Sequence, residues 1–473
     1  MKLLAGWRAA RTRTQPWRAI WHDTADLALA GRGLALIEQR GGWRLEPLRP
    51  SADGRDLRWP PGMPAPLLAE AADPEALGVP SPTRPVASCE GRLRTFTLRV
   101  GDSPLSLAVL DAEARGVTSR TPCARAWLEC EDDQAGLDAA LALAAQAPLA
   151  VARASLSGEV LAAAAGVAAQ PRRLGMPGMP PDADPATAFA HVVGHLADVV
   201  LYWADLAHPG NDVEPVHQIR VALRRLRACI SAFRRAVDSP PVQAVALTAR
   251  DLSRLLGPAR DWDVFVAETG AAVACSFPDD QPVSRLLASA VRRRDAAYEP
   301  LRAFLDGPSF REFGIRLAGL AGSRGWHAGL IEEQRDLLAS DLAEFAGRVL
   351  DRRLRRVLEA GENIADLDAP ALHKIRLDGK RLRYAAEIFS PLFSRKSVHR
   401  FQRRLADLQE HLGKLNDTAV TAHLMAALAG ERAGSDRAYA AGVVRGFVAA
   451  RAVEGRGDLG RCWDRFRGVK PFW

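Results

Sequence analysis

The sequence predicts a multidomain protein in which an α+β part with an antiparallel sheet is followed by an all-α part. Three observations lead to this fold class. Strand-like alternation is confined to the first 170 residues, a Pro- and Gly-rich stretch follows, and apolar residues then recur at the 3.6-residue spacing of helices. A chain of 473 residues is long enough for about two to four domains with separate cores.

The N-terminal part contains the patterns of strands, a hairpin and a helix. Residues 92–100 and 125–131 alternate between apolar and polar types, as strands do. The glycines at 31–33 and 41–42 punctuate a hairpin, and residues 137–147 are rich in the helix formers Ala and Leu. We therefore expect an antiparallel sheet with helical additions.

Two segments rich in Pro and Gly set the predicted organisation. Residues 59–66 predict a loop inside the first part, and residues 171–186 predict a linker between domains. The predicted domains are then 1–170 and 187–473, the second consisting of repeat one at about 187–325 and repeat two at about 330–473.

Composition excludes several classes of protein. Apolar residues make up 48% and charged residues 25%, as in ordinary soluble domains. No apolar run reaches the ~20 residues of a membrane span, the N-terminus lacks the apolar stretch of a signal peptide, and the six cysteines are scattered. We expect a cytoplasmic protein with reduced thiols, no cofactor, no bound metal and no membrane partner.

The helical part carries the excess positive charge and repeats one basic segment. Residues 1–170 have no net charge, so the +8 comes entirely from the rest of the chain. The segment HQIRVALRRLR begins at His217, and HKIRLDGKRLR begins at His373, 156 residues later. Further residues recur at the same offset, which indicates an internal duplication: Asp251, Leu256, Gly257 and Asp261 match Asp407, Leu412, Gly413 and Asp417.

On a helix, each copy separates cations from apolar residues. At 100° per residue, the cations of the first copy fall within about 100° of the circumference, beside an apolar stripe; they are His217, Arg220, Arg224, Arg227, Arg234 and Arg235. The second copy places His373, Arg376, Lys380 and Arg383 in the same way, with Glu387 positioned to hold Lys380 or Arg383.

A solvated amphipathic face is the alternative interpretation of such a stripe, and it predicts mixed charges. No acidic residue occurs from His217 to Val237, so these cations repel one another unless an outside anion compensates them. This favours a binding role. The two histidines are either structural or direct, pH-sensitive anion contacts. The Leu-Gly segments look like helix breaks, each with an Asp able to cap a helix or orient an arginine.

These paired His-x-x-Arg-(x)3-(Arg/Lys)-Arg-x-Arg helices, each followed by Leu-Gly-(x)3-Asp, resemble the CHAD domain, the conserved histidine α-helical domain. The resemblance covers roughly 187–473. It implies two four-helix bundles related by a pseudo-twofold axis, with basic helices that line a central groove or pore and bind inorganic polyphosphate. The implied polyphosphate ligands, to which Arg234 is added from the cationic stripe, are His217, Arg220, Arg224, Arg225, Arg227, His373, Arg376, Lys380, Arg381 and Arg383. Asp378-Gly379 departs from the apolar pair expected by analogy with Ala222-Leu223.

The segment 21–36 resembles the CYTH domain, the triphosphate tunnel fold, whose members use Glu-bound metal and a cationic tunnel on triphosphates. This copy lacks the expected Glu-x-Glu-x-Lys strand in 1–17, and Ile37 and Gln39 stand where arginines should alternate. We expect a degenerate tunnel-like domain with no catalytic residue. Glu129 and Glu131 alternate on a predicted strand, and are either tunnel ligands or solvent-facing carboxylates.

The leading hypothesis is a non-enzymatic, cytoplasmic polyphosphate-binding protein whose N-terminal domain is a scaffold or a partner module. A metal-dependent triphosphatase and a non-specific nucleic-acid binder are the alternatives. Few aromatic residues interleave with the cationic stripe, which argues against base stacking. A fourth hypothesis is targeting to polyphosphate granules through the same surface.

Overall fold

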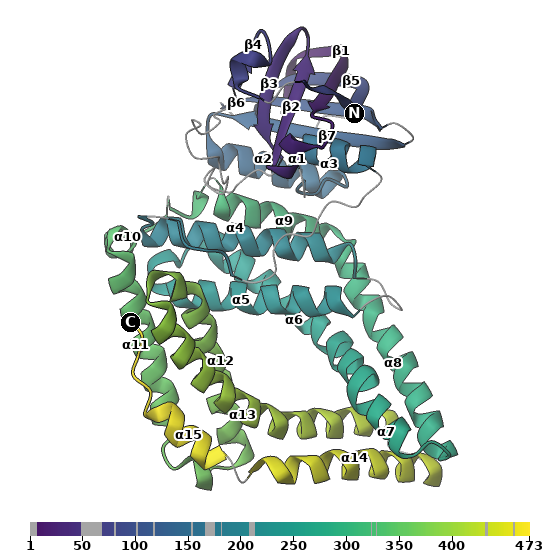
Figure 1. The fold of residues 1–473 in the computed structure, drawn as a ribbon, viewed down its shortest axis with the longest axis vertical. Helices are drawn as coiled ribbons and strands as arrows, with labels where there is room; N and C mark the ends of the chain where they lie inside the picture. The colour runs from purple at the N-terminus through teal and green to yellow at the C-terminus, as the bar shows by residue number, and fades with distance from the viewer. Residues whose placement is uncertain are drawn as a thin grey trace. The chain divides into compact units, whose positions relative to one another are not determined.

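The computed structural model describes most of the chain and divides it into two compact units (Figure 1). The described residues are 7–48, 69–79, 82–100, 103–116, 119–152, 155–165, 176–180, 182–207, 213–322, 324–327, 329–430, 434–456 and 459–473. The predicted loop at 59–66 and part of the predicted linker lie outside them. The first unit comprises Met1–Arg173 with Arg311–Gly325, and the second comprises Leu174–Phe310 with Trp326–Trp473. The predicted domain boundaries stay predictions.

The first unit contains the expected antiparallel sheet. Its seven described strands lie in the order β4-β3-β2-β1-β5-β6-β7. The predicted hairpin is β2–β3, and its turn residues Arg40 and Gly41 both have positive φ, as a tight two-residue turn requires. The strands are β1 (Trp7–Asp23), β2 (Leu34–Gln39), β3 (Gly42–Pro47), β4 (Ala69–Ala71), β5 (Arg84–Val100), β6 (Ser103–Arg115) and β7 (Arg120–Cys130).

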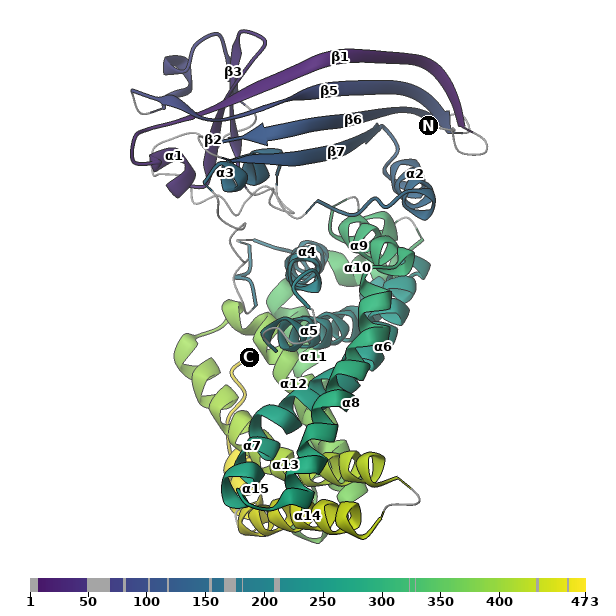
Figure 2. The ribbon, with the colours of Figure 1, turned by 90° about the vertical axis from the view of Figure 1, so that its right-hand side faces the viewer.

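Two helices cover opposite faces of this sheet. Figure 2 shows β1, β5, β6 and β7 curving together, with α3 (Leu156–Ala165) at one end and α2 (Asp133–Gln146) at the other. Val160 of α3 packs in a cluster with Trp21 and Cys89, whereas Leu143 of α2 packs with Leu98. Cys89 and Leu98 are nine residues apart on β5, so their side chains point to opposite faces. The tunnel itself stays a prediction.

The second unit is helical, as predicted. Two pairs of helices that follow each other in sequence, α5 with α6 and α12 with α13, pack against each other. The principal helices are α4 (Pro185–Ala204), α5 (Glu214–Val237), α6 (Pro240–Val264), α8 (Gln281–Leu305), α11 (Leu342–Ala360), α12 (Ala369–Phe389), α13 (Arg395–Ala429) and α14 (Ser435–Arg456). Shorter elements of this unit are η2 (Phe265–Gly270), α7 (Ala271–Ser276), η3 (Gly325–His327), α10 (Glu332–Ala339), η4 (Ile364–Asp366), η5 (Ser390–Leu392) and α15 (Leu459–Arg467). The first unit also contains α1 (Ala28–Gly31), η1 (Glu75–Leu77) and most of α9 (Pro308–Ala321).

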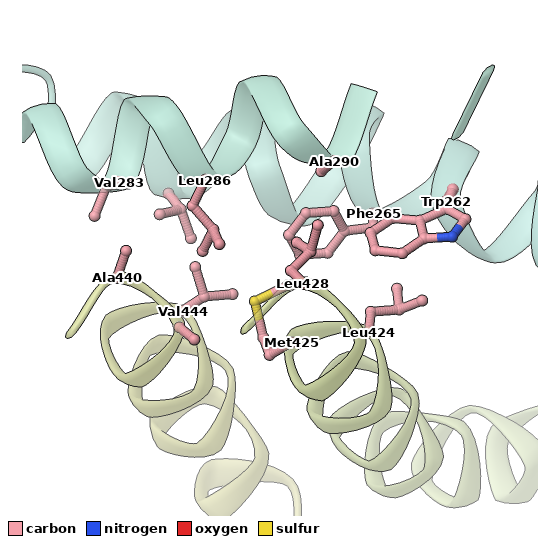
Figure 3. Close-up of a cluster of buried hydrophobic side chains, with 12 residues drawn as sticks. Trp262, Phe265, Val283, Leu286, Ala290, Leu424, Met425, Leu428, Ala440 and Val444 are labelled. Atoms are coloured by element: carbon pink, nitrogen blue, oxygen red, sulfur yellow. The ribbon is translucent and has the colours of Figure 1, made fainter. Parts of the chain in front are cut away.

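One core of the helical unit combines helices from both repeats. Figure 3 shows Trp262, Phe265 and Leu286, from α6, η2 and α8, facing Met425 of α13 and Val444 of α14. Figure 1 shows α13 and α14 at the opposite end of the unit from α4 and α5. The apolar faces of the two repeats therefore bury one another.

A second core joins the repeated basic helices. Phe233 of α5 and Phe389 of α12 are equivalent residues of the two copies, and their ring centroids lie 5.6 Å apart. Phe189 of α4 and Phe345 of α11 share the same 156-residue offset and pack against Phe233 at 5.5 and 5.0 Å. The duplication therefore extends to α4 and α11. This aromatic contact holds α5 against α12.

The expectation of helix breaks at the Leu-Gly segments is wrong. Leu256 and Gly257 lie inside α6, and Leu412 and Gly413 lie inside α13. At the first site α6 packs against α5, and a Cβ on Gly257 would stand 3.6 Å from Nη1 of Arg220, an ordinary contact distance. Tertiary contacts have overridden local helix propensity here.

Candidate polyanion-binding surface

Helix α5 exposes its cations because its apolar residues face the core. Ile219, Leu223, Leu226 and Phe233 are buried. Pro215 lies in the first turn, where its missing N–H costs nothing, and Arg234 and Arg235 lie in the last turn, where they complement the helix dipole. The remaining cations of α5 are consequently left on the side turned toward α6 and α12.

Arg220 and Arg224 lie in a crowded cationic environment. The guanidinium of Arg220 is 3.8 Å from Asp261, the Asp that the sequence suggested would orient an arginine. Burial holds the pKa of Arg220 below its usual value, and Arg224 and Arg260 act in the same direction. The guanidinium carbon of Arg224 lies 6.0 Å from the ring centroid of Tyr384 on α12, and its buried Nε finds no acceptor in the described part of the chain.

Arg227 shows that three helices supply cations to one surface. Burial lowers the pKa of Arg227, with further contributions from Arg250 and Arg254 of α6 and Arg381 of α12. The α6 arginines were missed by sequence reasoning. The available signal was the pair Arg250 and Arg254, four residues apart like Arg220 and Arg224, with Arg260 following six residues later.

His217 occupies the start of the same row. Burial lowers the pKa of His217, and Arg260, Arg224 and Arg220 lower it further, against Glu214, which raises it. The imidazole is consequently held mostly neutral near pH 7 in the absence of an anion.

Helix α12 presents cations that are already paired. Arg381 contacts Asp378 at 2.7 Å and Arg383 contacts Glu387 at 3.0 Å. Glu387 therefore pairs with Arg383, one of the two partners that the sequence suggested for it. Glu387 also accepts a hydrogen bond from Nε of Arg225 on α5 at 3.1 Å. Asp378 is the residue that departs from the apolar pattern of the first copy.

The remaining predicted ligands differ in how exposed they are. Arg376 and Lys380 are half-buried on α12, whereas His373 is exposed. Arg234 is exposed and lies 3.9 Å from Asp238.

Arg353 of α11 is a further cation that the sequence did not single out. Its side chain is only 8% exposed. It donates to the carbonyl of Arg381 at 2.9 Å and to Oγ of Ser231 at 3.2 Å, and no carboxylate pairs with it in the described ranges. Burial and the nearby Arg352 and Arg381 lower its pKa to about 10.

The structure offers no metal centre where it describes the chain. No group of three or more His, Cys, Asp or Glu side chains is arranged to hold a metal among the described residues. Glu129 and Glu131 are both exposed. Among the helices that the structure describes, none is long and apolar enough to cross a membrane.

The comparisons with known proteins identify the helical part. Residues 191–426 match the family model described as the CHAD domain. The crystal structure of the CHAD domain from the plant Ricinus communis is similar at 28% identity and a TM-score of 0.53, over 64% of this chain and 98% of that one. Residues 191–426 therefore form a CHAD domain.

PptA from Streptomyces chartreusis is a second similar structure, at 17% identity and a TM-score of 0.47. The similarity covers 60% of this chain and 100% of that one. None of the curated proteins compared with this chain matches it.

Proposed function

We propose that the protein binds inorganic polyphosphate through the surface formed by α5, α6 and α12. The observation that carries this proposal is the row of arginines on α5, in which the half-buried Arg220 and the exposed Arg227 have lowered pKa values and lie near more cations than carboxylates. Such an arrangement stores repulsion that a polyanion relieves. The CHAD resemblance supports the same ligand.

The ligand chemistry suits a repeating phosphate chain. Arginine forks bind phosphate oxygens through two parallel N–H bonds, and such charge-assisted bonds are stronger than neutral ones. A polyphosphate offers one phosphate after another along a flexible chain, so it reaches successive cations without base recognition. By analogy with nucleic acids, affinity should fall steeply with salt, because bound counterions are released.

A filter-binding titration of the full chain with long-chain polyphosphate at several salt concentrations tests the proposal. We expect salt-sensitive binding that is lost when Arg220, Arg224, Arg376 and Lys380 are changed together to Ala. Absence of binding, or full binding by this variant, would refute polyphosphate recognition at this surface. Competition with single- and double-stranded DNA distinguishes a general phosphate-backbone binder.

The proposal assigns the N-terminal unit no catalytic step. Its inner polar groups compensate one another: Arg44 contacts Glu46 at 3.2 Å, Ser157 donates to Glu46, and the indole of Trp21 donates to Ser157 at 2.7 Å. This supports a scaffold or partner module. Phosphate release from tripolyphosphate with Mg²⁺ or Mn²⁺ that is lost in Glu129→Gln would favour a triphosphatase instead. Co-localisation of the labelled protein with polyphosphate granules tests the targeting hypothesis.

A further inference from the structure

The cationic row on α5 has a gap that another helix fills. Arg220, Arg224 and Arg227 follow one another at helical spacing, and the next residue on that side is Ser231. Arg353 of α11 brings its guanidinium to this position, where it donates to the Ser231 hydroxyl at 3.2 Å. The row of positive charge therefore continues past Arg227 although the sequence of α5 does not supply the cation.

Further cations lie beside Arg353. The pKa of Arg352 is lowered by burial and by the nearby Arg235 of α5 and Arg356 of α11. Neither Arg352 nor Arg356 forms an ion pair within the described part of the chain. By contrast Arg348, one turn earlier on α11, contacts Glu344 at 2.8 Å.

The acidic residue that precedes Arg352 on α11 is bound to another partner. Asp351 precedes Arg352 in sequence, but its carboxylate accepts a hydrogen bond from the indole of Trp473 at 2.7 Å. Asp351 is therefore engaged elsewhere, and no ion pair with Arg352 or Arg356 occurs among the residues that the structure describes.

Packing of the duplicated helix does not require these arginines. Helix α4 is the equivalent of α11 in the first repeat, and at the 156-residue offset it carries Leu196, Ala197 and Val200 in place of Arg352, Arg353 and Arg356. All three are buried apolar residues in α4. The same helix is thus apolar at these positions in one repeat and cationic in the other, so the shared helical architecture alone does not require the cations.

We propose that Arg352, Arg353 and Arg356 of α11, with Arg235 of α5, form a separate phosphate subsite that binds the part of a long polyphosphate chain extending beyond Arg227. This inference rests on the proposed function and adds a preference for chain length. From Arg220 to Arg235 the α5 axis advances about 22 Å, whereas from Arg220 to Arg227 it advances about 10 Å. A long chain reaches both ends of the row, and tripolyphosphate occupies only one part of it.

The test compares two ligands on the full chain. In the double variant Arg352→Gln/Arg356→Gln, we expect affinity for long-chain polyphosphate to fall about tenfold at low salt, since two charge-assisted contacts are lost. The slope of log affinity against log salt should become shallower by about 1.4–1.8. Affinity for tripolyphosphate should stay within about twofold of the unmodified protein, because the α5 row binds it without the subsite.

Arg348→Gln is the control, because it makes the same type of substitution on the same helix outside the cluster and removes one positive charge there. Its affinity for both ligands should equal that of the unmodified protein. An unchanged long-chain affinity in the double variant, an equal loss for both ligands, or an equal loss in the control would overturn the subsite. If the unmodified protein bound neither ligand, the proposed function itself would fail, which is a distinguishable result.

Discussion

The two repeated helices carry the same cationic motif, yet they place it in opposite electrostatic settings. On α5, Arg220 has one carboxylate at 3.8 Å, and its pKa is lowered by burial and by its neighbours. On α12, Arg381 and Arg383 each contact a carboxylate of their own helix, at 2.7 and 3.0 Å. The α5 copy is therefore the one that gains more from an anionic ligand.

One pair of equivalent positions concentrates this difference. Glu387 of α12 corresponds to Ser231 of α5 at the 156-residue offset. Glu387 lies between Arg225 and Arg383 and offsets their charge. Ser231 carries no charge, and the cation Arg353 is bound there instead. A duplicated motif thus predicts where cations lie but not whether they are available to a ligand.

The largest expected effect comes from removing cations in the two settings separately. Arg220→Ala/Arg224→Ala should weaken polyphosphate binding about 100-fold at low salt, because it removes two arginines of which only Arg220 has a carboxylate nearby, at the long distance of 3.8 Å. Arg381→Ala/Arg383→Ala should weaken it by only about tenfold, because these side chains must first leave their carboxylates. Titrations of both variants at one salt concentration measure the difference, with melting temperatures as the control for folding. Equal losses would mean that the ion pairs on α12 do not limit its role.

Transferring the carboxylate of the second repeat to the first should abolish part of the asymmetry. In Ser231→Glu, the new carboxylate lies beside Arg353 and one turn after Arg227, and should pair with them. We expect polyphosphate affinity to fall about tenfold and the melting temperature of the ligand-free protein to rise. Ser231→Gln controls for side-chain size; if it weakened binding as much as Ser231→Glu, charge would not be the cause.

The reverse change should have a smaller effect. Glu387→Gln removes the charge that holds Arg225 and Arg383 but retains a hydrogen-bonding side chain. Affinity for polyphosphate should rise about threefold, since a partly exposed ion pair contributes about 0–1 kcal/mol. The melting temperature without ligand should fall, because the remaining arginines repel each other. A loss of affinity would show that Glu387 positions these arginines for the ligand rather than competing with it.

Sequence reasoning located the basic helices because a repeat and a helical period are local patterns. The helix of Arg220 and Arg224 and the presence of an antiparallel N-terminal sheet followed from such patterns. Arg353 could not be found in this way, because its contact with Ser231 joins residues 122 positions apart. The continuity of α6 through Gly257 was also hidden, since a Leu-Gly pair does not by itself tell a helix end from a helix interior.

The smallest expected effect is a pH dependence that belongs to His217 and hence to the α5 copy. Burial, followed by Arg260, Arg224 and Arg220, lowers the pKa of this imidazole in the free protein, and Glu214 opposes them. A bound phosphate adds negative charge and raises that pKa, so the complex holds more protons than the free protein between the two values. Affinity should therefore rise as the pH falls through the pKa of the complex, and level off below the pKa of the free protein.

Titrations with long-chain polyphosphate between about pH 8 and pH 5.5 should show this rise, of less than about tenfold for a shift of under one pKa unit. His217→Gln should remove it, while protonation of the ligand affects both proteins equally. A pH profile that is unchanged in His217→Gln would assign His217 a structural role, because the ligand's charge would then not reach its ring.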